Sequence, residues 1–258
     1  MSTHMQPPLA RAMVLAAGRG ERMRPLTDTC PKPLLRVRGM PLIGWHAQAL
    51  AQGGFAKLVV NTDWLGSQIT DYLSIFRTSH MDSLLSISYS DEGRDFGGAL
   101  ETAGGIARAL PLLGDTFWVL AADVYMPGFA FAQTAFDSFV ASGHLAHLWL
   151  VPNPPHHPHG DFGLDANGLA TSPAAASPEP RYTYSTVGLY RRAFFDALPA
   201  GNPQGTKAAL APLLRAAMAR GQISAELYLG PWTDVGTPAR LAELNQTAPE
   251  LNTLLSAK

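Results

Sequence analysis

The sequence is poor in cysteine, in charged residues and in long apolar runs. Its one cysteine, Cys30, cannot form a disulfide within the chain, so a reducing cytoplasm is the expected compartment. Only 15% of the 258 residues are charged and the formal net charge is -1, which lacks the basic field of a nucleic-acid-binding protein. No apolar run approaches the roughly 18 residues of a transmembrane helix, so no membrane partner is expected.

Two common phosphate-binding motifs are also missing near the N-terminus. No Gly-Lys-Ser/Thr sequence opens a helix after the first glycines, so the chain is not a P-loop ATPase. Met23 stands where a dinucleotide-binding fingerprint that starts at Gly18 needs its third glycine, which excludes a standard dinucleotide-dependent reductase. Residues 1–10 lack the charged and apolar regions of a signal peptide, so we expect them to be a disordered leader.

Short apolar strands alternate with amphipathic helices along much of the chain. Strands are expected at 11–17, 57–61, 84–89, 116–121, 146–151, 182–190, 223–229 and 232–234. Helices are expected at 41–52, 65–76, 102–110, 129–142, 207–220 and 237–245. This alternation, with 47% hydrophobic residues, predicts an α/β fold with a Rossmann-like mixed, mostly parallel sheet flanked by helices. Ligands bind beyond the carboxyl ends of such strands, where Gly18 and Asp123 fall.

The segment after the first strand, LAAGRGERMRPLTDTCPKPLL (15–35), joins small residues to a cluster of cations. Small residues let backbone N–H groups approach phosphate oxygens closely, and fixed cations can neutralise a triphosphate. The cations are Arg19, Arg22, Arg24 and Lys32, and Pro25, Pro31 and Pro33 stiffen the loop. Residue types alone therefore indicate a phosphate-binding loop, with a solvated basic loop as the alternative.

The order of residues in this loop resembles the signature of sugar-1-phosphate nucleotidyltransferases. The pattern G-x-G-x-R-x-x-P-L-T followed by P-K-P runs from Gly18 to Pro33. Further segments follow in the order that the family has: VVNTDWLGSQI (59–69), LETAGGI (100–106), AAD (121–123), GDF (160–162) and WTDVGT (232–237). The compact length, WLG, LETAGG and GDF are most similar to the N-acetylmuramate-1-phosphate uridylyltransferases of bacterial cell-wall recycling.

The resemblance implies a fold of the nucleotide-diphospho-sugar transferase type in one domain, residues 11–250. Its nucleotide half is expected at about 11–125 and its sugar-binding half at about 126–250. The implied reaction joins a nucleoside triphosphate, UTP as first choice, to a sugar 1-phosphate, N-acetylmuramate 1-phosphate as first choice, and releases pyrophosphate. Mannose-1-phosphate guanylyl transfer and glucose-1-phosphate thymidylyl or uridylyl transfer are alternatives. A noncatalytic nucleotide-sugar-binding regulatory subunit is the alternative of another class.

The resemblance also implies roles for individual residues. Asp123 and Asp234 match the family's ligands for Mg²⁺, for which hard carboxylate oxygens are suited, although each can also be a turn residue. Arg22 matches the arginine that steadies the β- and γ-phosphates, and Lys32 the lysine at the reacting phosphates. With Asp123 these two are the expected catalytic residues. The expected nucleotide-binding residues are Ala16, Ala17, Gly18, Gly20, Arg22, Lys32, Asn61, Thr102 and Gly104.

The sugar-binding residues implied by the resemblance are Glu101, Gly160, Asp161 and Arg181. Many relatives have Glu-Lys-Pro after the GDF segment, where this chain has Glu179, Pro180 and Arg181, so Arg181 is the expected substitute for the lysine. His156, His157 and His159 match no compact zinc site, and we expect them in a solvated loop. The expected partners are the two substrates alone, with no nucleic acid and no membrane, in a monomer or small homo-oligomer.

Overall fold

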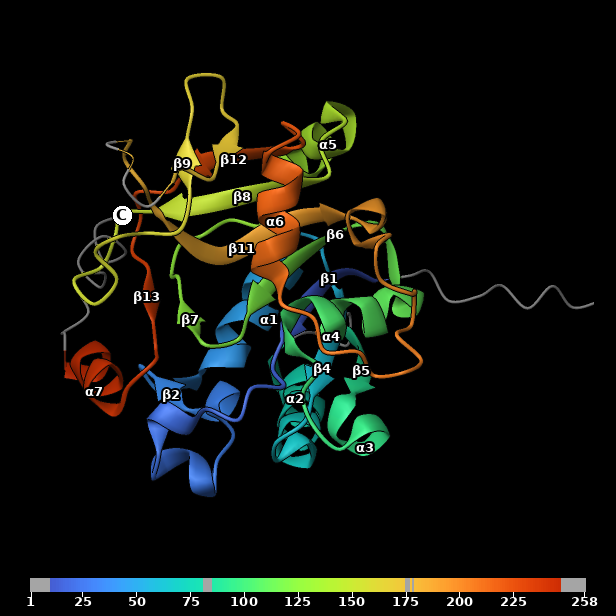
Figure 1. The fold of residues 1–258 in the computed structure, drawn as a ribbon. Helices are drawn as coiled ribbons and strands as arrows, with labels where there is room; N and C mark the ends of the chain where they lie inside the picture. The colour runs from blue at the N-terminus through green and yellow to red at the C-terminus, as the bar shows by residue number, and fades with distance from the viewer. Residues whose placement is uncertain (1–9, 81–84, 175–176, 178, 247–258) are drawn as a thin grey trace, which may run out of the picture.

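The computed structural model describes residues 10–80, 85–174, 177 and 179–246, and Figure 1 shows the path of the chain. Except for Ala10, the expected leader lies outside the described residues. Within them, the central sheet has seven strands in the order β12-β8-β11-β6-β1-β4-β5. The strands are β1 (Ala10–Leu15), β4 (Lys57–Thr62), β5 (Ser86–Asp91), β6 (Leu113–Ala121), β8 (Ala146–Val151), β11 (Thr183–Arg191) and β12 (Ile223–Leu227).

One strand of this sheet, β11, runs against all the others. It pairs antiparallel with both β6 and β8, whereas every other neighbouring pair is parallel. The predicted mixed, mostly parallel sheet is therefore confirmed. Parallel sheets bury both faces, and successive residues of β1 show this directly: Met13 packs on one face, and Ala12 and Val14 on the other.

Helices cover both faces of the sheet (Figure 1). On one face, α4 (Glu101–Ala109) and α6 (Leu210–Met218) contribute to the same apolar cluster as Met13. On the other, α1 (Leu42–Gln52), α2 (Gly66–His80) and α5 (Gln133–Ser142) pack against Ala12 and Val14. The remaining helices are the short α3 (Glu92–Phe96) and α7 (Pro238–Gln246). No helix in the described part of the chain is long and apolar enough to span a bilayer.

Two expected helices begin later than their hydrophobic spacing predicts. The helix expected from residue 129 starts at Gln133, because Phe129 and Phe131 lie in a loop and pack edge-on against Trp118, with ring centroids 6.2 and 5.1 Å away. The helix expected from residue 207 starts at Leu210, because the carbonyl of Ala208 instead accepts hydrogen bonds from two amides at the start of α4. In both cases a tertiary contact overrides the local pattern.

The carboxyl ends of β1 and β6 lie side by side at the centre of the sheet, with Leu15 opposite Ala121. Beyond them, β7 (Val124–Tyr125) pairs antiparallel with β13 (Thr233–Asp234). The Val235 amide donates to the Asp123 carbonyl at 2.8 Å. The N-terminal loop, the end of β6 and the C-terminal segment therefore meet at one edge of the sheet.

Two smaller two-stranded pairs lie outside the central sheet. They join β2 (Arg36–Val37) to β3 (Met40–Pro41) and β9 (Gly163–Leu164) to β10 (Ala170–Thr171).

Candidate active site

A cavity of about 400 Å³ opens beyond the carboxyl ends of β1 and β6. It brings together most residues that the sequence assigned to the nucleotide: Ala16, Ala17, Gly18, Gly20, Arg22, Lys32, Asn61, Thr102 and Asp123, with Glu101 of the expected sugar set. Gly104 has a different place. It is buried in α4, and a Cβ there would lie 2.6 Å from the Thr206 carbonyl oxygen, so close packing of two backbones accounts for this glycine.

Gly20 shapes the loop around this cavity. Its φ is +70°, and a Cβ would lie 3.0 Å from Thr27 Cγ2 and 3.2 Å from Lys32 Cβ. The Gly20 carbonyl accepts hydrogen bonds from the Thr27 hydroxyl and from the Met23 amide, each at 2.9 Å. The loop therefore folds back on itself at a position that favours glycine, and it closes around the stem of Lys32.

The four cations of the loop divide into two kinds. Arg19 lies 3.6 Å from the centroid of the Trp64 ring and donates to the Thr27 carbonyl at 2.9 Å. Arg24 contacts Glu21 at 3.1 Å and Asp28 at 3.2 Å. These two arginines hold the loop together through contacts with the protein's own groups.

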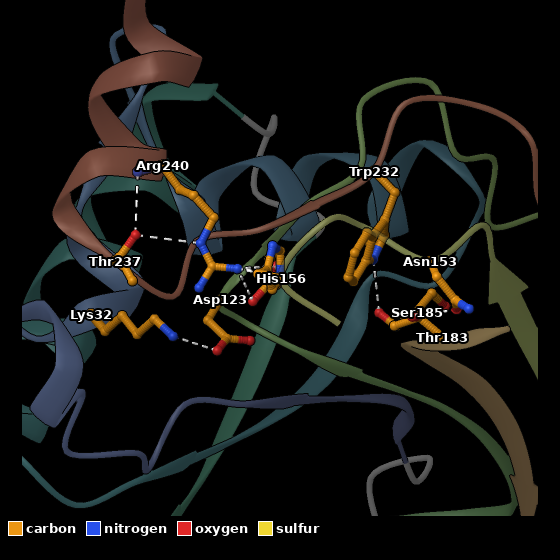
Figure 2. A network of polar contacts seen from close by, with 10 residues as sticks. Lys32, Asp123, Asn153, His156, Thr183, Ser185, Trp232, Thr237 and Arg240 are labelled. Carbon is orange, nitrogen blue, oxygen red and sulfur yellow. Dashed lines mark hydrogen bonds and ion pairs between the residues drawn. The ribbon is translucent and has the colours of Figure 1, made fainter. Parts of the chain in front are cut away.

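The other two cations, Arg22 and Lys32, both line the cavity. Arg22 is exposed and makes no hydrogen bond or ion pair with any described residue, so its guanidinium is free for an anion. Lys32 is 9% exposed, and its Nζ donates to Asp123 Oδ2 at 2.5 Å (Figure 2). The cavity is therefore lined by two kinds of cation. The exposed Arg22 has no partner among the described residues, and the buried Lys32 is hydrogen-bonded to a carboxylate.

A buried polar pair supports the cavity: Asn61, which was expected at the nucleotide, and Glu92, which the sequence analysis missed. Asn61 Oδ1 accepts from the Ala16 amide at 2.7 Å, and its Nδ2 donates to Glu92 Oε1 at 2.7 Å. Glu92 Oε2 accepts from the Leu100 amide at 2.7 Å. Burial raises the pKa of the Glu92 carboxyl, against the opposing effect of these hydrogen bonds. Glu92 directly follows β5 at the carboxyl edge of the sheet, and that position is the signal that could have identified it.

The backbone of Asp234 pairs with that of Val124, the residue after Asp123. The Asp234 side chain, however, contacts Arg240 and His156. Arg240 Nη1 lies 2.6 and 2.7 Å from its two carboxylate oxygens, and His156 Nε2 lies 2.7 Å from Oδ1. Figure 2 shows Arg240, His156 and Asp123 in this region. His156 is exposed, as expected of a solvated loop, but its imidazole also contacts Asp234, because the loop that carries it reaches the C-terminal segment.

The carboxylates fit the chemistry of a magnesium site. The described residues contain no group of three or more His, Cys, Asp or Glu side chains placed to hold a metal. Magnesium in phosphate-transferring sites is usually held by one or two carboxylates together with substrate phosphates, so Asp123 and Asp234 suffice in number and type. Asp123 Oδ1 has no hydrogen-bond partner among the described residues, whereas Asp234 would have to exchange its contact with Arg240.

A second cavity, of about 540 Å³, adjoins the first and shares Leu15, Glu101, Thr102 and Ala121 with it. Asp161, expected at the sugar, lines it and accepts from the Tyr184 amide at 2.8 Å. Thr186 also lines it, at a φ of +69° where β11 bulges. The Thr186 hydroxyl oxygen is buried without a hydrogen-bond partner in the described structure, which leaves it free for a ligand.

The other two residues expected at the sugar lie elsewhere. Gly160 has a φ of +58°, and a Cβ there would lie 2.7 Å from Asn153 Oδ1, so it is a tightly packed turn residue. Arg181 donates to the Pro173 carbonyl at 2.5 Å and lines a separate hollow with His159. The structure therefore does not bring Arg181 to the cavity where it was expected to replace the missing lysine.

Comparisons with known proteins agree with this geometry. A sequence model of the nucleotidyl transferase family matches residues 11–250. The chain is 47% identical over 245 residues to the N-acetylmuramate alpha-1-phosphate uridylyltransferase of Neisseria meningitidis serogroup B, across 92% of this chain and 98% of that protein. It is 32% identical over 248 residues to the protein of the same name from Caulobacter vibrioides, across 90% of this chain and 97% of that one.

A solved structure has the same fold. It is a crystal structure from Bacillus anthracis, provisionally assigned as a glucose-1-phosphate thymidylyltransferase and bound to sucrose. Its TM-score is 0.73 at 20% sequence identity, covering 94% of this chain and 96% of that chain, a likeness that concerns the fold alone. Taken together, the matched family model, the two similar sequences and the shared fold establish that the chain belongs to the nucleotidyl transferase family.

Proposed function

We propose that this enzyme transfers a uridylyl group from UTP to N-acetylmuramate 1-phosphate and releases pyrophosphate. The observation that carries the proposal is the convergence of Arg22, Lys32 and Asp123 on one cavity that opens into a second, largely apolar one. The first cavity suits a triphosphate and the second a sugar ring. The names of the two relatives described above favour uridylyl and N-acetylmuramate over other bases and sugars.

The reaction needs positioning and charge neutralisation more than a covalent nucleophile, because a sugar phosphate oxygen attacks the α-phosphorus directly. In this proposal Lys32 contacts the phosphate oxygens at the reacting centre, and its buried stem fixes where that charge lies. Arg22 contacts the β- and γ-phosphates and neutralises the charge of the leaving pyrophosphate. Ala16, Gly18 and Gly20 border the nucleotide through backbone atoms, and Asn61 positions this segment by its bond to the Ala16 amide.

Magnesium bound at Asp123 and Asp234 would supply charge neutralisation between the two phosphate groups. The carboxylate contact with Lys32 also keeps Asp123 in place before substrate arrives. We place the reaction in the cytoplasm, where both charged substrates are retained by a membrane that they cannot cross.

The test is pyrophosphate release from UTP, GTP, dTTP or ATP against a panel of sugar 1-phosphates, with Mg²⁺ or with a chelator. We expect the highest kcat/KM for UTP with N-acetylmuramate 1-phosphate, and loss of turnover when the metal is chelated. Higher kcat/KM for GTP with mannose 1-phosphate, or for dTTP with glucose 1-phosphate, would replace the proposed substrates by these alternatives. Nucleotide binding with no turnover for any pair would favour a regulatory subunit.

A further inference from the structure

The second cavity contains a cation that the proposed reaction does not use. Arg215, on α6, is the one lysine or arginine among the described residues that line it. Its guanidinium carbon lies 5.7 Å from the centroid of the Phe162 ring. The guanidinium makes no hydrogen bond or ion pair with a described residue, so its five N–H donors have no acceptor in the described part of the chain.

The two carboxylates in the same cavity do not neutralise this cation. Asp161 is engaged with the Tyr184 amide at 2.8 Å and with His157 Nε2 at 3.1 Å. Glu101 lies where the two cavities join, because it lines both. The wall next to Arg215 is apolar and comes from Leu210, Ala211 and Leu214. Arg215 is itself exposed while it lines this cavity, so its guanidinium can reach an anionic group of a ligand that enters from solvent.

The position of Arg215 separates it from the reacting phosphates. Lys32 and Asp123 line only the first cavity, and Arg215 lines only the second. A sugar 1-phosphate with its phosphate beside Lys32 would extend its ring past Glu101 and Thr102, which belong to both cavities. The part of the sugar near Arg215 is then a ring substituent on the side away from the phosphate.

We propose that Arg215 binds the carboxylate of the sugar's lactyl substituent and so selects N-acetylmuramate 1-phosphate over N-acetylglucosamine 1-phosphate. The inference rests on the proposed function, since only a sugar with an acidic substituent needs this cation. A planar guanidinium matches a carboxylate with two parallel hydrogen bonds, which favours arginine over lysine in this role. The Thr186 hydroxyl in the same cavity offers a further polar contact to the ring.

The experiment measures kcat/KM with saturating UTP for the two sugar phosphates, which differ only in the lactyl ether. We compare the wild type with Arg215→Met, Arg215→Lys and the control Arg220→Met. Arg220 follows α6, is exposed and bonds to Gln222 through Nε at 2.7 Å. Arg215→Met should lower kcat/KM for N-acetylmuramate 1-phosphate roughly 10- to 100-fold, mainly by raising KM, because a contact remote from the phosphorus is made equally before and during reaction.

In Arg215→Met the ratio of kcat/KM between the two sugars should fall by a similar factor. Arg215→Lys should give an intermediate ratio. Arg220→Met should leave the ratio at the wild-type value. Equal losses on both sugars in Arg215→Met would overturn the inference, because the contact would then be to a shared group or to the fold. An unchanged ratio in Arg215→Met would also overturn it while leaving the proposed function intact. A wild-type enzyme that prefers the sugar without the lactyl group would instead refute the proposed substrate itself.

Discussion

Arg240 Nη1 lies 2.6 and 2.7 Å from the two carboxylate oxygens of Asp234. The same arginine contacts His156 and the Thr237 hydroxyl, so the loop that carries His156 and the C-terminal segment meet at one carboxylate (Figure 2). A guanidinium held against both oxygens occupies lone pairs and neutralises charge that a metal ion would otherwise use. The Arg240–Asp234 contact therefore competes with the proposed role of Asp234 in binding Mg²⁺.

Arg240→Gln should lower the Mg²⁺ concentration that gives half-maximal turnover, because the metal would no longer displace a guanidinium from Asp234. We expect a shift of roughly three- to tenfold, as for loss of one partly exposed ion pair. The measurement is a Mg²⁺ titration of pyrophosphate release, with Arg220→Gln as the control. A higher Mg²⁺ requirement in Arg240→Gln would mean that Arg240 supports Asp234 as a ligand and does not compete for it.

Lys32→Met should reduce kcat/KM at least about 100-fold, because it removes a fixed positive charge beside the reacting phosphates. The change keeps the apolar stem, so the melting temperature should stay within a few degrees of the wild type. Steady-state kinetics and thermal unfolding check the two parts. Lys57→Met, at the exposed start of β4, is the matched control and should keep its turnover. Near-normal turnover in Lys32→Met would contradict its assigned role.

Arg22→Met and Arg24→Met should differ, although the two residues are only two positions apart. Arg22 lines the cavity and its side chain has no partner among the residues that the structure describes, so its loss should reduce turnover about tenfold or more and leave stability unchanged. Arg24 is half exposed and paired with Glu21 and Asp28, so its loss should cost about 0–1 kcal/mol of stability and little turnover. Kinetics and urea unfolding of both variants test the division, and the reverse pattern would refute it.

Gly20→Ala and Gly18→Ala form a second matched pair. Gly20 has a left-handed φ, and a methyl group would press on Thr27 and Lys32, so we expect a loss of about 1–2 kcal/mol in unfolding free energy. A Cβ at Gly18 meets nothing within 4 Å, so stability should change by less than about 0.5 kcal/mol. Since Gly18 lines the cavity, Gly18→Ala should instead raise the KM for the triphosphate. Equal destabilisation by both changes would contradict this account.

His46 and His147 should make the protein less stable in mild acid. Burial lowers the pKa of each imidazole from its ordinary value of 6.5 to about 4. The unfolded chain therefore binds protons first as the pH falls, so stability is fully present above about pH 6.5 and decreases towards pH 4. The decrease should be on the order of 3 kcal/mol per histidine. Urea unfolding at several pH values measures it, and His46→Gln should flatten the slope. An unchanged slope in that variant would contradict the burial of a neutral imidazole.

The sheet could be predicted from the sequence because its strands are apolar in themselves. Lys57–Thr62 is buried at five of its six positions, and the hydrophobic spacing predicted it to within one residue. The antiparallel direction of β11 could not be predicted, since direction depends on the path of the preceding loop and not on the strand's own residues. Similarly, no local pattern distinguishes a helix from the buried loop that holds Phe129 and Phe131 against Trp118.

The candidate site was predictable where the residues form a contiguous motif, and less so where contacts join distant loops. The glycine- and cation-rich loop and Asp123 both stand beside strand ends, so their meeting followed from the topology. The sequence did not show which of the four cations face the cavity, because the position of Arg19 depends on its stacking on Trp64, which belongs to another segment. The contacts of Asp234 with His156 and Arg240 depend on a loop crossing that no spacing encodes.

The hydrogen bond from the Val235 amide to the Asp123 carbonyl has a consequence for biosynthesis. A chain that is still emerging from the ribosome contains the phosphate-binding loop and Asp123 long before it contains residue 235. Until translation has passed that point, the Asp123 carbonyl lacks its backbone partner, and Asp234, the second carboxylate of the proposed magnesium site, is not yet present. We therefore expect a nascent chain that ends before residue 233 to release no pyrophosphate from nucleotide.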